Sequence, residues 1–271
     1  MDDIFDLNPK IRLILGFFVA ICVISVGIGI PYITNPVTSG LIYLNNPQIP
    51  IYLFGKLRTI WILADLFALF WIVGLMNFVN WSKGLDGQMP GVVVIAAITI
   101  ALLSQKFSAD IAQWQVSILA LIVAGAFLGF LVWNAYPQKI MPGYGGGTLA
   151  GYLLAILAIL STTKVGTLMI VLGIPIIDAI YVIIRRLYVG QSPLWGDTRH
   201  LHHTLLRFGF TKRQIAIFYW LITAILGFVA LKLNSQQKLY TMVLLFLFFG
   251  IFLIWVRRLS ISSSPPAPDN G

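Results

Sequence analysis

Long apolar stretches separated by short polar breaks constrain this chain more than any other feature. A membrane-spanning helix needs about 20 apolar residues. Stretches near that length occur at 13–30, 60–80, 91–105, 112–134, 147–162, 165–188, 212–232 and 239–257. With 59% hydrophobic residues and a mean hydropathy of +0.91, the composition excludes a soluble domain. The sequence therefore predicts an all-α, polytopic membrane helical bundle with about eight transmembrane segments.

Two regions differ in composition from these stretches. Residues 259–271 are rich in Ser and Pro, and such a segment buries too little apolar surface to fold. They are predicted to be a disordered tail, behind a single transmembrane domain at 1–258. Residues 31–59 are rich in Pro, Asn and Gly and are predicted to be irregular or a short hairpin outside the membrane.

The positive charge of the chain bears on its partners and its orientation. The net charge is +9, but the 18 basic residues are scattered through short loops and form no stripe interleaved with aromatic residues. We therefore expect anionic substrates and acidic lipid headgroups as partners, and no nucleic acid. With a cytoplasmic N-terminus, 12 of the 18 Lys and Arg residues face the cytoplasm, as the positive-inside rule requires. This topology places every polar motif on the cytoplasmic face of the cell membrane.

All three histidines lie in one polar break, Gly196–Arg207. One interpretation is a solvated loop. A second is a metal site, because His200 and His203 are one helical turn apart, although no Cys or Glu is near to complete a tetrahedral set. A third is anion recognition, in which His200, His202 and His203 act with Arg199 on phosphate oxygens. The third interpretation fits the surrounding charges best.

A second polar break is the acidic N-terminus, with Asp2, Asp3 and Asp6. Three close carboxylates repel one another unless a cation or hydrogen-bond donors compensate. They are therefore predicted to bind Mg²⁺ or to act as a base. The alternative is an acidic terminus that frays.

A third break follows the stretch at 60–80. Asn77 and Asn80 are three residues apart, so they share a helix face, and Gly84 and Gly87 then end the helix. These amides are predicted to face a site, although interfacial capping explains them about as well.

The break at 134–151 is dense in glycine, which allows backbone amides to approach a phosphate. A packing turn of small residues is an equally good explanation.

The stretch at 165–188 carries Asp178 and, seven residues later, Arg185. This spacing puts both side chains on one helix face, about 10 Å apart along the axis. The face is predicted to look inward, because an Asp facing lipid costs about 3 kcal/mol. Alternatively, the arginines at 185 and 186 anchor the helix at lipid headgroups.

In their order along the chain, five breaks resemble motifs of the polyprenyl-phosphate N-acetylhexosamine-1-phosphate transferases. This family includes the phospho-MurNAc-pentapeptide translocase and relatives that move GlcNAc-1-phosphate. The run D-D-I-F-D resembles its DDxxD loop, and N-F-V-N-W-S-K-G-L-D-G resembles its N-x-x-N-x-x-D-G-x-D-G. The run N-A-Y-P-Q-K-I-M-P-G-Y-G-G-G resembles its N-x-x-P-x-K-I-F-M-G-D-x-G-S, and D-T-R-H-L-H-H resembles its histidine loop. The run from Pro175 to the two arginines matches its P-I-x-D segment.

The resemblance implies transfer of N-acetylhexosamine 1-phosphate from a UDP-sugar to a polyprenyl phosphate, with release of UMP. It implies Mg²⁺, a place in cell-envelope glycan synthesis and a possible homodimer. Asp2, Asp3 and Asp86 would bind the metal, and these three together with His202 would be catalytic. The residues expected to bind substrate are Asn77, Asn80, Lys83, Lys139, Asp178, Arg185, Arg199, His200 and His203.

The chain departs from the family pattern in several places. Lys83 stands where the pattern has its first aspartate, and Gly147 replaces its serine. Tyr144 replaces the acidic residue usually given the metal-binding role, and a phenol with a pKa near 10 cannot act as a carboxylate at neutral pH. The resemblance also implies further membrane helices before residue 2, so the chain is expected to be short at its N-terminus.

Two alternatives therefore stay open. One is a catalytically impaired relative that binds lipid phosphate or UDP-sugar. The other is an ion or solute transporter that uses Asp65 and Asp178.

Overall fold

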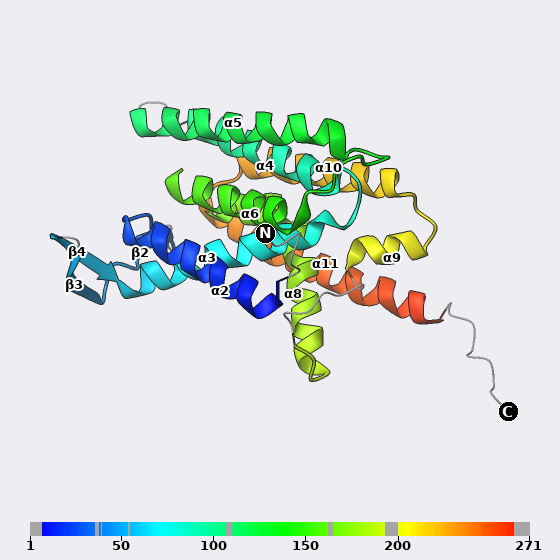
Figure 1. The fold of residues 1–271 in the computed structure, drawn as a ribbon, viewed down its shortest axis with the longest axis horizontal. Coiled ribbons are helices and arrows are strands. Elements are labelled where there is room, and N and C mark those ends of the chain that lie inside the picture. The colour runs from blue at the N-terminus through cyan, green and yellow to red at the C-terminus, as the bar shows by residue number, and fades with distance from the viewer. Residues whose placement is uncertain are drawn as a thin grey trace.

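The protein is described here by a computed structural model of residues 7–35, 38, 40–53, 55–106, 110–161, 165–192 and 200–262. Within these ranges the chain is mainly helical, and its strands form two short hairpins (Figure 1). The helices are α2 (Pro9–Ser25), α3 (Ile62–Trp81), the 3-10 turn η1 (Ser82–Gly84), α4 (Gln88–Gln105), α5 (Ile111–Asn134), α6 (Gly143–Leu160), α7 (Val165–Val171), α8 (Gly173–Tyr188), α9 (Leu201–Arg207), α10 (Lys212–Lys232) and α11 (Ser235–Ser262).

The length and composition of the helices confirm the predicted all-α, multi-pass membrane protein. Six described helices are long and apolar enough to cross a membrane, namely α3, α4, α5, α6, α10 and α11. The bent pair α7 and α8 makes a seventh if it is counted as one span. The first predicted stretch, 13–30, corresponds to α2, which has 17 residues and ends at Ser25.

The stretch at 165–188, predicted as one span, consists of two helices joined at a sharp bend. The chain bends by 81° at Leu172, between α7 and α8. Pro175 explains the break, because it has no N–H to donate to Val171 and its ring would clash with that carbonyl in a continuous helix. In the first turn of α8 the missing donor is tolerated. Figure 1 shows α8 leaving the bundle at a steep angle to the other helices.

Glycines let α3 and α6 pack with their backbones nearly touching. A Cβ atom on Gly151 would lie 2.2 Å from the carbonyl oxygen of Leu75, and one on Gly147 would lie 2.3 Å from Asn80 Oδ1. Small residues four apart are a common way for membrane helices to approach closely. This packing fixes the first turn of α6 against the last turns of α3. α4 has 14 of its 18 residues buried.

Local capping sets where several helices begin. Asn8 accepts a hydrogen bond from Lys10 N ahead of Pro9, and Asp110 accepts one from Ala112 N. Thr211 caps α10 in a capping box with Gln214. Its side chain accepts a hydrogen bond from Gln214 N, while the Gln214 side chain accepts one from Thr211 N.

Residues 31–59 contain both hairpins. β1 (Tyr32–Thr34) pairs with β2 (Leu41–Tyr43), and β3 (Gln48–Leu53) pairs with β4 (Lys56–Trp61), both antiparallel. Figure 1 shows them at one end of the bundle, with α9 at the other end. At the C-terminus, α11 continues into the predicted tail as far as Ser262, and residues 263–271 lie outside the described ranges. The predicted disorder of that tail stays a prediction.

Candidate functional site

The loop Ser82–Gly87, between α3 and α4, is the point where distant polar breaks meet. We call it the α3–α4 loop. Lys83 contacts the start of α6, Gly84 lies against His202 of α9, and Asp86 reaches both the α5–α6 connection and α10. The Asp178 segment joins them through the contact of Asp178 with His200, so four of the five predicted polar breaks are neighbours in space. The fifth, the acidic N-terminus with Asp2 and Asp3, lies outside the described residues.

Asp86 is held by two donors from different parts of the chain. Its side chain is buried, and Oδ2 accepts a hydrogen bond from Gln138 N at 3.1 Å. Oδ1 lies 3.2 Å from Nζ of Lys212, the first residue of α10. Hydrogen bonds to a buried carboxylate are stronger than neutral ones. Asp86 was predicted to be catalytic and to bind metal, and the structure places it in an ion pair with Lys212.

The next residue, Gly87, fixes the turn into α4. Its φ of 75° is left-handed, which favours glycine. Gly87 N donates to Asn134 Oδ1 at 3.0 Å, and the Trp220 indole donates to the Gly87 carbonyl at 3.1 Å. These bonds join the start of α4 to the end of α5 and to α10.

Lys83 and Tyr144, the two main departures from the family pattern, are in contact. Lys83 Nζ donates to the carbonyl oxygen of Gly143 at 2.6 Å and lies 5.6 Å from the centroid of the Tyr144 ring. The guanidinium of Arg12, in the first turn of α2, lies 4.8 Å from the same centroid. Both distances are within the roughly 6 Å range of a cation–π contact. The start of α6 therefore carries two cations around one aromatic ring.

The two asparagines of α3 lie in different surroundings. Asn77 is half-buried, and its Nδ2 donates to Val73 O at 2.8 Å, within its own helix. Asn80 is buried against Gly147, and its Oδ1 accepts no hydrogen bond in the structure that is described. A buried carbonyl oxygen without a donor costs about 1–3 kcal/mol. Asn80 is therefore held by packing against α6 rather than by a hydrogen bond to its Oδ1.

Asp178 holds the histidine segment in place. Its Oδ2 lies 2.8 Å from Nδ1 of His200, and its Oδ1 accepts a hydrogen bond from Leu201 N at 2.9 Å. Asp178 was predicted to bind substrate directly. The structure instead gives it contacts that orient His200 and the start of α9.

The three imidazole rings lie together beside Trp81. His200 and His202 are parallel, with centroids 5.6 Å apart, and His203 lies 4.3 Å from His202. The Trp81 ring is 6.1 Å from His200. A Cβ on Gly84 would be 2.3 Å from His202 Nε2, so the α3–α4 loop approaches this ring as closely as only glycine allows. His200 and His202 are also buried, so these two rings are not solvated as the first interpretation predicted.

A small cavity of about 10 Å³ lies between the histidines and α4. That volume corresponds to about one water molecule. Gln88 lines it and is fully buried, and its Oε1 and Nε2 find no hydrogen-bond partner within the described ranges.

Two other predicted substrate-binding residues make no side-chain hydrogen bond to Asp86 or the histidines in the described structure. Lys139 is exposed, with Nζ 5.4 Å from the centroid of the Trp133 ring. Arg185 is half-buried near the end of α8, and its Nη1 has no hydrogen-bond partner in the part of the chain that is described. Arg199 lies outside the described residues, so its predicted role stays a prediction.

A comparison with protein families explains this arrangement. The model of the family described as glycosyl transferase family 4 matches residues 1–162, which is more than half of the chain. The chain belongs to glycosyl transferase family 4. This confirms the resemblance found in the five motifs.

Individual relatives of this family 4 member carry related names. It is 30% identical over 253 residues to the probable undecaprenyl-phosphate N-acetylglucosaminyl 1-phosphate transferase of Bacillus subtilis, covering 91% of this chain and 65% of the relative. It is 29% identical to the undecaprenyl-phosphate alpha-N-acetylglucosaminyl 1-phosphate transferase of Yersinia pestis, covering 94% and 67%. It is 33% identical to the phospho-N-acetylmuramoyl-pentapeptide-transferase of Bacillus licheniformis, covering 59% and 49%. The chain thus spans between about half and two thirds of the length of these relatives.

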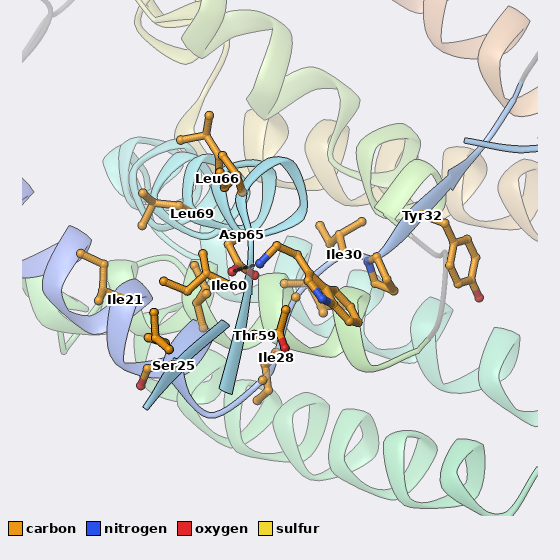
Figure 2. A pocket seen from close by; sticks show the side chains of 18 of the residues that line it. Ile21, Ser25, Ile28, Ile30, Tyr32, Thr59, Ile60, Asp65, Leu66 and Leu69 are labelled. Atoms are coloured by element: carbon orange, nitrogen blue, oxygen red, sulfur yellow. Dashed lines mark hydrogen bonds between the residues drawn. The ribbon is translucent and has the colours of Figure 1, made fainter. Parts of the chain in front are cut away.

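The larger cavity of this family 4 member lies elsewhere. It has a volume of about 1070 Å³ and is lined mainly by apolar side chains from α2, α3 and the β3–β4 hairpin. Figure 2 shows Asp65 among isoleucine and leucine side chains, with one carboxylate oxygen accepting a hydrogen bond from Trp61 N. Asp65 lies near the start of α3 and Asn80 near its end, about 22 Å apart along the helix axis. This cavity and the polar cluster are therefore at opposite ends of α3.

Sequence reasoning missed the residues that hold the cluster together. Lys212, Gln138 and Asn134 had no predicted role, yet they bind Asp86 and Gly87. The only sequence signal was their position, since all three lie in breaks on the predicted cytoplasmic side. Trp220 gave no signal at all.

Burial sets the protonation of His202 in this family 4 member. Burial lowers its pKa well below the ordinary value of 6.5, and the neighbouring His203 and His200 lower it further. The folded protein therefore holds His202 neutral, whereas the unfolded chain protonates it near pH 6.5. Below pH 6.5 the unfolded chain binds a proton at His202 that the folded protein does not. The free energy of unfolding is therefore unaffected by His202 above pH 6.5 and decreases as the pH falls below it.

We therefore expect the melting temperature to fall as the pH drops from 7 to 5, and His202→Gln to flatten this dependence. Thermal unfolding of the detergent-solubilised protein, followed by tryptophan fluorescence, measures it. His203→Gln is the control and should keep most of the slope, because burial is the larger cause of the pKa shift of His202. An unchanged slope in His202→Gln would contradict the assignment.

Proposed function

We propose that the protein transfers N-acetylhexosamine 1-phosphate, most simply GlcNAc 1-phosphate, from a UDP-sugar to a polyprenyl phosphate. Membership of glycosyl transferase family 4 and the names of the relatives support the transferase over a transporter. The observation that carries the proposal is the α3–α4 loop: its Lys83, Gly84 and Asp86 contact Gly143, His202 and Lys212, which come from segments far apart in the sequence. Phosphoryl transfer depends mainly on positioning and on neutralising charge, and such a cluster suits both.

The proposed reaction forms one bond and breaks another at the same phosphorus. An oxygen of the lipid phosphate attacks the phosphorus that carries the sugar. The bond from that phosphorus to the bridging oxygen of the diphosphate breaks, and the bridging oxygen leaves with UMP. The product is a polyprenyl diphosphate sugar. Negative charge develops on the leaving UMP, so nearby cations and hydrogen-bond donors lower the barrier.

The site residues take roles that follow from their surroundings. His200, His203 and the predicted Arg199 are proposed to bind diphosphate or sugar oxygens. Neutral His202 can donate one hydrogen bond and accept another. Asp86, with Lys212 beside it, is proposed to act on the nucleotide-sugar side. The remaining proposed substrate contacts come from Asn77, Asn80, Lys83, Lys139 and Arg185, with Asp178 acting through His200.

Mg²⁺ was predicted with Asp2, Asp3 and Asp86 as ligands. The residues that the structure describes do not fit it. The Asp86 carboxylate is shared by Lys212 and Gln138, and the described ranges contain no group of three or more His, Cys, Asp or Glu side chains that could hold a metal ion. Asp2 and Asp3 lie outside those ranges, so their metal-binding role stays a prediction. No step of the proposed reaction is assigned to the metal.

The proposal also places the protein in the cell. The polar cluster is proposed to face the cytoplasm, where UDP-sugars are made, with the lipid tail between membrane helices. The cluster lies at the end of the bundle that holds the basic residues counted as cytoplasmic, such as Lys83, Arg207 and Lys212. A role in cell-envelope glycan synthesis and a homodimer remain predictions.

Release of UMP from UDP-GlcNAc by the purified full chain with undecaprenyl phosphate tests the proposal. We expect turnover, and we expect Asp86→Asn to reduce it by at least about 100-fold with the fold retained. Lys212→Met is the companion variant, because it leaves the carboxylate but removes its ion-pair partner. Binding of UDP-GlcNAc without UMP release would instead indicate the catalytically impaired relative. Neither binding nor release, with UDP-GlcNAc or UDP-MurNAc-pentapeptide, would refute both.

A further inference from the structure

The contact between Lys83, Tyr144 and Arg12 gives this site a property that the family resemblance does not supply. The inference rests on the proposed function, because it concerns how the same site holds phosphate. Lys83 and Tyr144 are distant in sequence, and each replaces an acidic residue of the pattern that the chain resembles. In the structure they form one contact, with Arg12 over the same ring.

The chemistry of these three side chains makes them poor ligands for a metal ion. Mg²⁺ takes oxygen ligands, mainly carboxylates, phosphates and water. An ammonium and a guanidinium offer only donors, and a neutral phenol replaces the carboxylate at the third position. A divalent cation placed here would also be repelled by both charges. This corner of the site therefore supplies positive charge directly from side chains.

The backbone at the start of α6 adds N–H donors, which carry partial positive charge. α6 begins at Gly143, and the amides of a helix N-terminus attract anions. Gly145 is exposed, and a Cβ built on it would meet nothing within 4 Å among the described residues, so none of these residues covers the helix end there. An ammonium carries three N–H donors, so the bond from Lys83 to Gly143 O does not exclude a phosphate oxygen.

We propose that Lys83, with Arg12 held beside it on the Tyr144 ring, binds phosphate oxygens of the substrate in place of a divalent cation. Transfer by this protein then does not require Mg²⁺. The ring of Tyr144 positions the two cations, whereas its hydroxyl is not needed for that role.

The first test measures binding without any metal. UDP and undecaprenyl phosphate are titrated separately into the full chain in detergent with EDTA, because both carry phosphate oxygens. We expect Lys83→Met to weaken binding of one of them at least about 10-fold, and that ligand is the one that Lys83 holds. Lys83→Arg keeps the charge and should bind within about threefold of the wild type. Tyr144→Phe should bind normally, and Tyr144→Ala should bind weakly.

A matched control separates this effect from the general loss of a lysine. Lys232 also lies over an aromatic ring, that of Phe228, with Nζ 5.7 Å from the centroid, but at the far end of α10. Lys232→Met should leave binding of both ligands unchanged. Melting temperatures of all variants show whether each one is folded.

The second test measures dependence on metal. We expect equal UMP release in EDTA and in Mg²⁺, and no Mn²⁺ bound to the wild type by electron paramagnetic resonance. The double variant Lys83→Asp with Tyr144→Asp should bind Mn²⁺. Turnover that EDTA abolishes and Mg²⁺ restores would overturn the inference, as would normal ligand binding by folded Lys83→Met. Absence of turnover together with Lys83-dependent binding in EDTA would instead count against the transferase function and leave the inference standing.

Discussion

Replacing Gly151 with alanine is expected to destabilise the protein by about 3 kcal/mol, at the upper end of the usual cost of overpacking a core. The added Cβ would lie 2.2 Å from Leu75 O, 2.6 Å from Leu75 C and 2.7 Å from Met76 Cα. These are backbone atoms of α3, so no side-chain rotation can relieve the clash. The two helices must separate, and the melting temperature should fall by about 6–12 °C. Thermal unfolding in detergent, followed by tryptophan fluorescence, measures the change.

A second helical glycine provides the control for this prediction. Gly129 lies within α5, and a Cβ there would meet nothing within 4 Å. Alanine is favoured over glycine in a helix by roughly 0.5–1 kcal/mol, so Gly129→Ala should raise the melting temperature slightly or leave it unchanged. Equal melting temperatures for the two variants would contradict the close packing of α3 on α6.

The loss at Gly151 should also reach the site. Separation of α3 from α6 moves Asn80 away from Gly147 and Lys83 away from Gly143. We therefore expect UMP release by Gly151→Ala to fall even at temperatures where the protein remains folded.

The sequence predicted the membrane helices and the meeting of the polar breaks because both follow from local composition. Apolar stretches of the right length become helices in a bilayer, where backbone groups have no other partners. Once their number and orientation are set, the breaks at 77–87, 134–151 and 196–207 are placed on one side of the membrane. Their proximity in the structure follows from this topology together with short connections.

The bend at Leu172 and the partners of Asp86 could not be predicted in the same way. Proline is tolerated in membrane helices when neighbouring groups satisfy the freed carbonyl, so Pro175 alone does not decide between a kink and a break. Gln138 binds Asp86 through its backbone N–H, which every residue but proline possesses. Such a contact cannot be recognised from the identity of the residue.

The contact between Lys83 and Tyr144 also could not be predicted from the sequence. In the sequence they are two separate departures from a pattern, and each alone argues against activity. The structure shows a single cluster in which an ammonium and a guanidinium share one ring. A joint change of both positions fits a site that exchanged metal ligands for fixed positive charge better than a site that decayed at random.

Replacing Asp178, which contacts His200 and the start of α9, is expected to cause a large loss of activity. Asp178→Ala removes the acceptor for both His200 Nδ1 and Leu201 N. Each hydrogen bond to a charged group contributes about 1.5–3 kcal/mol. Without them His200 and the start of α9 lose their fixed position, and a displacement of about 1 Å can cost a reaction 100-fold. We expect UMP release to fall by at least about 100-fold.

The comparison of Asp178→Asn with Asp178→Ala separates positioning from charge. The asparagine can still accept the hydrogen bond from Leu201 N, so it should keep more stability than alanine while it still loses the charged partner of His200. Asp65→Asn is the matched control, since Asp65 also accepts a backbone hydrogen bond but lies at the opposite end of α3 from the cluster. It should leave UMP release unchanged. If Asp178→Ala retained wild-type turnover, or if Asp65→Asn lost as much, the orientation of His200 by Asp178 would have no part in the reaction.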